Sequence, residues 1–296
     1  MVGRPVWQWG AGELGVHAAI EVAAAEGVVP YVRRAHDEDL AAAITGVAGS
    51  GRPGVVVVEG TSCAGKSRAL FEAITGDPAV RQWQLVVPGE PAPPDPAVLG
   101  DVVAAVVSAG TVIWLDELQR WLPRTKQGVR AAELLGGLLA GWDQVGPVLI
   151  AGTVWPANWN VMTNRPSPEQ SDDGADAIVA FLSHAREVHA KDVFTDTDLA
   201  HADVTDPRWQ VAAAAAARLA EGRKITQVLA GGPQLERRMS VPVSEGGFSD
   251  AAKAILLACG DLRRVGMDNP LPLWAIRGAA PGYLDPPDPN PAAPWF

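Results

Sequence analysis

Short hydrophobic runs alternate with segments of helical periodicity along the first half of the chain. The runs are Val55–Val58, Leu85–Val87, Thr111–Leu115 and Val148–Ala151. Runs that are apolar at every position predict strands buried on both faces of a parallel sheet. The segments between them predict helices at Lys66–Ile74, Ala97–Ser108 and Val129–Trp142. This alternation predicts an α/β fold with three layers, in which helices cover both faces of a parallel sheet.

The pattern changes after Asn164, where a polar, turn-rich segment begins. Beyond it we expect a mainly helical region, with helices at Ala175–His189, Pro207–Glu221, Thr226–Met239 and Ser249–Val265 and one strand near Lys191–Phe194. Turn clusters rich in Gly, Pro and Ser indicate boundaries between parts of the chain. We therefore predict an N-terminal helical segment at residues 1–50, an α/β core at 51–165, a helical lid domain at 166–284 and a Pro-rich tail at 285–296.

Composition limits the classes of partner. The formal net charge of −10 makes nucleic acid an unlikely partner, because binding to a polyanion relies on Lys and Arg. Two cysteines give neither a disulfide framework nor a paired metal motif. No apolar stretch approaches the roughly 18 residues of a membrane span, and the N-terminus lacks the pattern of a signal peptide. These features predict a cytoplasmic protein with no membrane contact.

The most informative motif follows the first long strand. Gly60-Thr61-Ser62-Cys63-Ala64-Gly65-Lys66-Ser67 satisfies the pattern G-x-x-x-x-G-K-[ST] of a P-loop. Its glycines let backbone N–H groups turn toward phosphates, and the helix N-terminus behind it favours anions. Lys66 is predicted to reach the β- and γ-phosphates of ATP and Ser67 to ligate Mg²⁺, with Arg68 also among the nucleotide-binding residues. The alternative interpretation is an ordinary Gly-rich turn.

Two acidic residues end the next long strand. Asp116 and Glu117 follow Thr111–Leu115 in the Walker B arrangement, one strand and helix after the loop. Asp116 is predicted to hold Mg²⁺, and Glu117 to polarise the water that attacks the phosphate. Thr153 ends the following strand, where it would lie beside the γ-phosphate or cap a turn before Trp155-Pro156. Glu117, Lys66 and Thr153 are therefore the predicted catalytic residues of an ATPase.

These motifs together resemble the STAND and AAA+-like P-loop ATPases. The segments GTSCAGKSRALFEA, WLDELQRW, AGTVWPANW and ITQVLAGGP are similar to a bacterial STAND-like subgroup. Tyr31–Leu40 resembles the aromatic-Val-Gly-Arg-Glu motif that precedes the core in these families, with Arg33 in place of its Gly. The resemblance implies that Tyr31 to Arg34 lie along adenine, with Tyr31 and Val32 as the predicted binding residues. It also implies that Pro233, in a Gly-x-Pro motif, closes over the base, although an ordinary turn between helices is an equal alternative.

The resemblance implies a signalling switch that hydrolyses ATP to ADP. Its members usually carry further domains, so we expect a short member, a fragment, or a module that acts in trans on a protein partner or in a homo-oligomer. The candidates for an arginine finger are Arg120, Arg124, Arg130 and Arg165.

Other interpretations remain open. A nucleotide-binding regulatory module without turnover and a P-loop small-molecule kinase share the same loop. The lack of an Asn-Lys-x-Asp motif argues against a GTPase. For Cys63, a tolerated small residue and a redox-sensitive thiol are both compatible with the sequence. The tryptophans are interpreted as packing residues, and the five histidines lack metal-ligand spacing.

Overall fold

Six strands form one sheet in the part of the chain that the computed structural model describes. That part is residues 3–16, 28–88, 95–106, 108–141, 145–164, 173–200, 205–217, 224–265, 267 and 271–284. In spatial order the strands are β1 (Arg4–Pro5), β3 (Gln84–Val86), β4 (Thr111–Leu115), β5 (Val148–Val154), β2 (Gly54–Glu59) and β6 (Ala185–His189). All neighbours are parallel except β1, which is antiparallel to β3. The predicted α/β class is thus confirmed.

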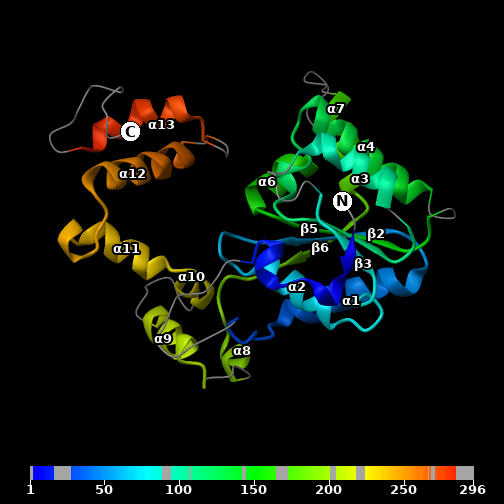
Figure 1. The fold of residues 1–296 in the computed structure, drawn as a ribbon, viewed down its shortest axis with the longest axis horizontal. Coiled ribbons are helices and arrows are strands. Elements are labelled where there is room, and N and C mark those ends of the chain that lie inside the picture. Colours follow the sequence, from blue (N-terminus) through cyan, green and yellow to red (C-terminus); the bar gives the residue numbers. More distant parts are fainter. Residues whose placement is uncertain are drawn as a thin grey trace. The chain divides into compact units, whose positions relative to one another are not determined.

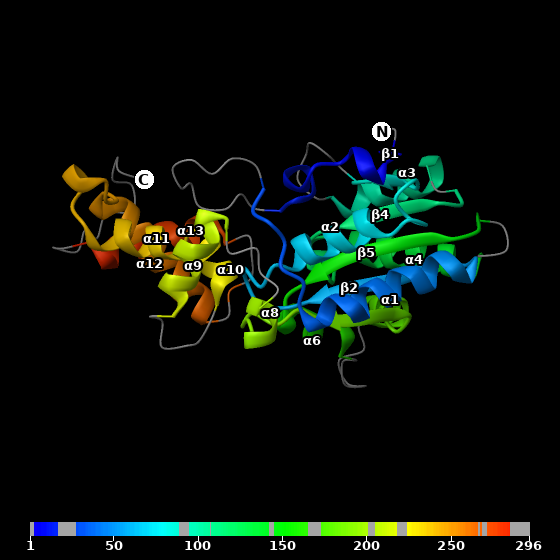
Figure 2. The ribbon, with the colours of Figure 1, turned by 90° about the horizontal axis from the view of Figure 1, so that it is seen from below.

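Along each strand, successive side chains point to opposite faces of the sheet, and helices pack against both faces. Val55 and Val57 of β2 join one buried cluster, whereas Val56 and Val58 join another. The first cluster is covered by α3 (Pro96–Val106), α4 (Lys126–Ala140), α6 (Pro156–Thr163) and α7 (Asp173–Leu182) (Figure 1). The second is covered by α1 (Ala35–Ser50), which lies beside β2 in Figure 2, and by α2 (Lys66–Gly76). Burial on two faces explains the fully hydrophobic strand sequences.

β6, the edge strand next to β2, differs from the sequence prediction. The predicted helix Ala175–His189 ends at Leu182, and its last residues form β6. The strand predicted at Lys191–Phe194 is a loop. β6 has neighbours on one side only, and Val188 is its one fully buried side chain. An edge strand with polar, exposed side chains lacks the hydrophobic run by which the other strands were found.

The helices after β6 pack against the segment that precedes α1. They are α8 (Asp196–Ala200), α9 (Pro207–Ala216) and α10 (Ile225–Leu229). Trp209 Nε1 donates to the carbonyl of Pro30 at 3.0 Å, and its ring meets Phe194 edge-on at 5.6 Å. Val29 and Val32 belong to the same buried cluster. These helices therefore belong to the unit that contains the sheet, Met1–Ala230.

A second compact unit spans Gly231–Phe296. It contains α11 (Gly232–Ser240), α12 (Asp250–Arg264) and α13 (Leu273–Ala279), with short 3₁₀ turns at Val243–Glu245 and Ala280–Tyr283. Buried alanines line the contact of α12 with α13 and the last turn. The sequence predicted a boundary near residue 165, whereas the units divide at Gly231. Most of the stretch Pro166–Gly174 and all of the tail 285–296 lie outside the described residues. No described helix is long and apolar enough to cross a membrane.

Candidate functional site

The loop Gly60–Ser67 joins the carboxyl end of β2 to the first turn of α2. At residue 60 a Cβ atom would stand 2.7 Å from the carbonyl oxygen of Ala190, so only glycine fits. Gly65 has φ +88° and caps α2, and Cys63 has φ +56°. The first N–H groups of a helix lack partners within it, which makes this end of α2 suited to an anion. The loop thus has the backbone conformation and helix end that a phosphate requires.

The side chains of Ser67 in α2 and Thr153 in β5 meet at Asp116, the residue that follows β4. Ser67 Oγ donates to Asp116 Oδ1 at 2.8 Å, and Thr153 Oγ1 donates to the same oxygen at 2.7 Å. The backbone N–H of Glu117 in turn donates to Thr153 Oγ1 at 3.0 Å. β5 lies between β2 and β4, and Leu115 is paired with Gly152, so Asp116, the residue after β4, lies level with Thr153 near the end of β5. The structure brings these predicted residues together.

The charges at this site are substantially removed from water. Lys66 is 6% exposed, and its Nζ donates to the carbonyl of Thr61 at 3.0 Å. Burial lowers the pKa of Lys66, although the nearby carboxylates of Glu117 and Asp116 act in the opposite direction. Burial raises the pKa of Asp116 against the effect of its hydrogen bonds from Thr153 and Ser67. Charges in such surroundings interact more strongly with a bound ion than exposed charges do.

Glu117 has an unusual backbone and a restrained carboxylate. Its φ of +57° lies in the left-handed region, which residues other than glycine seldom adopt. Its Oε1 accepts from Trp155 Nε1 at 2.8 Å, and its Oε2 accepts from the amide of Gln119. Such outliers occur preferentially at functional sites, where surrounding contacts hold them. The side chain at the predicted base position is therefore fixed rather than free.

The donor set around Asp116 fits magnesium. Ser67, Asp116 and Thr153 offer oxygen atoms only, which is the ligand type that Mg²⁺ prefers. Among the described residues there is no group of three or more His, Cys, Asp or Glu that could hold a metal by itself. Magnesium is commonly held by one or two carboxylates together with substrate phosphates, so a single buried carboxylate with hydroxyl neighbours is compatible with it.

Two residues near the site make contacts that the sequence analysis did not predict. Gly15, with φ +79°, approaches the carboxylate of Asp116 from the N-terminal segment. Arg34 is buried, and its Nη1 donates to the carbonyls of Ala64 in the loop and Lys191 beyond β6, at 2.9 and 2.8 Å. Arg34 belongs to the predicted adenine-side motif, but nothing in the sequence indicated its contact with the loop or marked Gly15, because both contacts join segments far apart in the chain.

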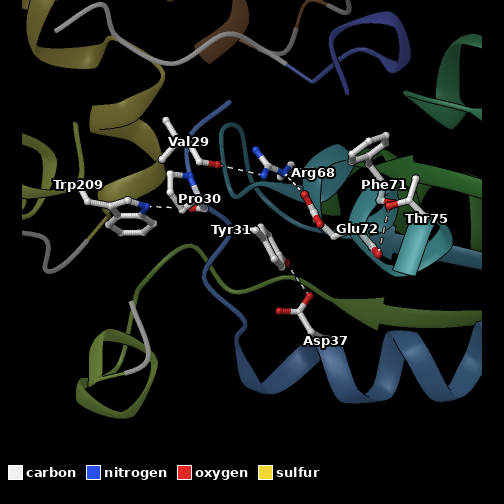
Figure 3. A network of polar contacts seen from close by, with 9 residues as sticks. All are labelled: Val29, Pro30, Tyr31, Asp37, Arg68, Phe71, Glu72, Thr75 and Trp209. Carbon is white, nitrogen blue, oxygen red and sulfur yellow. Dashed lines mark hydrogen bonds and ion pairs between the residues drawn. The ribbon is translucent and has the colours of Figure 1, made fainter. Parts of the chain in front are cut away.

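Tyr31, one of the predicted adenine-side residues, lies in a network of contacts with Arg68 (Figure 3). The Arg68 guanidinium lies 5.5 Å from the centre of the Tyr31 ring and donates to the carbonyl of Val29 at 3.0 Å. The Tyr31 hydroxyl donates to Asp37 Oδ1 at 2.6 Å. Val32 is buried in the cluster with Trp209, so a contact of Val32 with a base would have to use its backbone. Adenine contact by Tyr31 and Val32 stays a prediction.

The remaining candidates lie apart from Asp116 or outside the description. Thr61 donates to Asp192 Oδ2 at 3.3 Å, Ser62 is exposed beside Cys63, and Ala64 is buried. Pro233 lies in α11 of the second unit, and its side chain is not among those described.

The arginine-finger candidates differ in their partners. Arg124 donates to the carbonyl of Asn164 at 3.0 Å, and Arg130 pairs with Glu133 at 3.4 Å. Arg120 ends the 3₁₀ turn Leu118–Arg120, and Arg165 lies outside the described residues.

Neither the protein-family models nor the curated protein sequences contain a match to this chain. The function must therefore be argued from the chain's own residues.

Proposed function

We propose that this chain binds ATP with Mg²⁺ at the loop Gly60–Ser67 and hydrolyses it, as a switch of the STAND and AAA+-like type. The observation that carries the proposal is the 2.8 Å hydrogen bond from Ser67 Oγ to Asp116 Oδ1. It joins the hydroxyl that follows the loop lysine to the carboxylate that follows β4, two strands away from β2 in the sheet. These are the two ligand types that P-loop ATPases use for magnesium.

The loop and Lys66 account for binding of the phosphates. A buried ammonium group is stabilised by a nearby anion, and Lys66 sits at the N-terminus of α2, where a phosphate is also favoured. Lys66 donates to the Thr61 carbonyl, a bond that it would exchange for phosphate oxygens. Ser67 and Asp116 would hold magnesium, which when bound neutralises charge on the phosphate oxygens.

Glu117 supplies the group that hydrolysis requires. Its carboxylate would take a proton from the water that attacks the γ-phosphorus, while the bond from that phosphorus to the bridging oxygen breaks and ADP leaves. Thr153 contributes by holding two neighbours at once, because it donates to Asp116 and accepts from the Glu117 backbone. Thr153 thereby fixes Asp116, the proposed magnesium ligand, and Glu117, the proposed base, relative to each other.

The proposed ligands are ATP and ADP. The switch would act within a homo-oligomer or on a protein partner in trans. We propose a cytoplasmic location, which the free thiols of Cys63 and Cys259 support, because disulfides are rare in that compartment.

Calorimetry with ATP, ADP and GTP, with and without Mg²⁺, tests the proposal beside a phosphate-release assay. Lys66→Ala should weaken ATP binding roughly 10- to 100-fold, the loss expected when a charged hydrogen-bond donor is removed. Asp116→Ala should lose the magnesium-dependent part of binding. Glu117→Gln should keep ATP affinity and lose phosphate release.

Each contrary outcome selects a different function. Unchanged ATP affinity in folded Lys66→Ala overturns the assignment of the loop. Binding by the wild type without phosphate release favours the nucleotide-binding regulatory module. Phosphate transfer to an added metabolite instead of water favours the small-molecule kinase.

A further inference from the structure

Trp155, the residue that follows β5, contacts Glu117, the predicted catalytic base. It follows the last strand residue, and its carbonyl accepts the N–H of Trp159 as α6 begins. Its indole N–H donates to Glu117 Oε1 at 2.8 Å. Side chains two residues apart in an extended chain point to the same side. Thr153 and Trp155 therefore act together: Thr153 holds the Glu117 backbone, and Trp155 holds the Glu117 carboxylate.

The same indole ring also faces the loop lysine. Lys66 Nζ lies 5.7 Å from the centre of the Trp155 ring, within the range of a cation–π contact. One side chain thus contacts both Glu117, the proposed base, and Lys66, the proposed phosphate-binding residue.

We propose that Trp155 is a positioning residue that orients the Glu117 carboxylate toward the attacking water, an inference that rests on the proposed hydrolysis. A carboxylate has about four acceptor positions on its two oxygens. Trp155 occupies one position on Oε1, and Gln119 occupies one on Oε2. Each oxygen keeps a further position at which it can accept a hydrogen bond, and then a proton, from water. The indole therefore fixes the direction of the base without blocking it.

The chain offers a matched control in the first turn of α6, which begins directly after Trp155. Trp159 packs against the buried cluster on that face of the sheet, so Trp159→Phe changes an indole to a phenyl ring away from Glu117. Trp155→Phe keeps a ring beside Lys66 and removes the N–H donor. Comparing these two variants separates the loss of one hydrogen bond from the general effect of a smaller ring.

Steady-state phosphate release gives the first readout. Trp155→Phe should lower kcat roughly tenfold or more, because a misdirected catalytic group loses much of its effect, while KM and ATP affinity stay near wild type. Trp159→Phe should retain the wild-type kcat. In a Glu117→Gln background, Trp155→Phe should cause no additional loss. Equal kcat in the two single variants, or a full additional loss in the double variant, overturns the positioning role while leaving the proposed ATPase intact.

Nuclear magnetic resonance of the indole N–H groups supplies a readout that does not need turnover. Each of the 11 tryptophans has one such group, and the signal that disappears in Trp155→Phe identifies residue 155. Glu117→Gln should move this signal and leave that of Trp159 in place, because it replaces the charged acceptor. An unmoved Trp155 signal overturns the inference. If the wild type binds ATP without turnover, hydrolysis fails as the function, and the indole signal still decides whether Trp155 holds Glu117.

Discussion

Gly15 lies so close to Asp116 that a Cβ atom at residue 15 would stand 2.7 Å from Asp116 Oδ2. The other oxygen of this carboxylate accepts the hydrogen bonds from Ser67 and Thr153. The N-terminal segment reaches this position because Val6 N donates to the Trp83 carbonyl beside β3, and because Leu14 packs in the cluster with α2. The chain's first residues thus form one side of the proposed magnesium site.

Gly15→Ala should weaken magnesium-dependent ATP binding about tenfold, which is about 1.4 kcal/mol. The new methyl group must displace the Asp116 carboxylate, and φ +79° is unfavourable for alanine. Gly12→Ala is the matched control, since no atom lies within 4 Å of its added Cβ. Calorimetry with and without Mg²⁺ measures the effect. Similar magnesium dependence in the two variants would contradict a role for Gly15 at the site.

The strands that could be predicted from the sequence are those buried on both faces of the sheet. Thr111–Leu115 is a strand with the predicted bounds, and the predicted helix at Lys66 begins there. β6 could not be found in this way, because exposed polar residues at a sheet edge give no hydrophobic run. The break at Gly231 was also missed within a predicted continuous helix, since a single glycine is compatible with a helical pattern.

The meeting of Ser67, Asp116 and Thr153 could be expected, because the carboxyl ends of neighbouring parallel strands lie at one edge of the sheet. The parts of the site that were missed depend on long-range packing. Arg34 reaches Lys191 across 157 positions, and the indole of Trp155 reaches Glu117 across 38. Neither spacing belongs to a local motif, so residue types alone could not separate these contacts from ordinary packing.

Arg34 is expected to support the loop from a buried position. Arg34→Met should lower the free energy of unfolding by about 1–3 kcal/mol, because the carbonyls of Ala64 and Lys191 lose their donor. ATP affinity should fall as well, since Ala64 lies within the loop. Arg33→Met is the control, because Arg33 is the exposed neighbour. Chemical denaturation and ATP calorimetry should separate the variants, and equal stability of the two would contradict the support role.

His36 predicts a pH dependence of stability. Burial is the main cause that lowers the pKa of His36 to about 4, and the Arg34 guanidinium and His189 act in the same direction. Asp37 and Asp198 act in the opposite direction. The folded protein therefore keeps this imidazole neutral, while the unfolded chain binds a proton below the ordinary pKa near 6.5.

Between pH 6.5 and 4 the unfolded state binds more protons, so stability should fall as the pH is lowered through this window. The loss from this group is on the order of 1–3 kcal/mol. His36→Phe should flatten the dependence, whereas the same change at the exposed His184 should preserve it. Denaturant unfolding at several pH values measures both. A wild-type slope in His36→Phe would assign the pH dependence to other groups.

The final prediction concerns the boundary between the two units, at Gly231. Thr226 of α10 lies against the loop, since a Cβ atom at Gly65 would stand 3.6 Å from Thr226 Cγ2. Five residues later, Gly231 has φ +92° and begins the second unit. A change in the loop between ATP and ADP would therefore reach α10 first. A ligand shifts an equilibrium only through different affinities for two states, so a switch requires this segment to differ between nucleotides.

Hydrogen exchange around residues 225–240 should therefore differ between the ATP and ADP complexes. Gly231→Ala should reduce that difference, because alanine disfavours the left-handed backbone at the boundary. Gly246→Ala is the control, because Gly246 has a similar φ of +85° inside the second unit. A change that depends on strain alone would affect both variants equally, and that result would contradict a hinge at Gly231. If both nucleotides protect the wild-type segment identically, the switch should be abandoned in favour of a constitutive nucleotide-binding module.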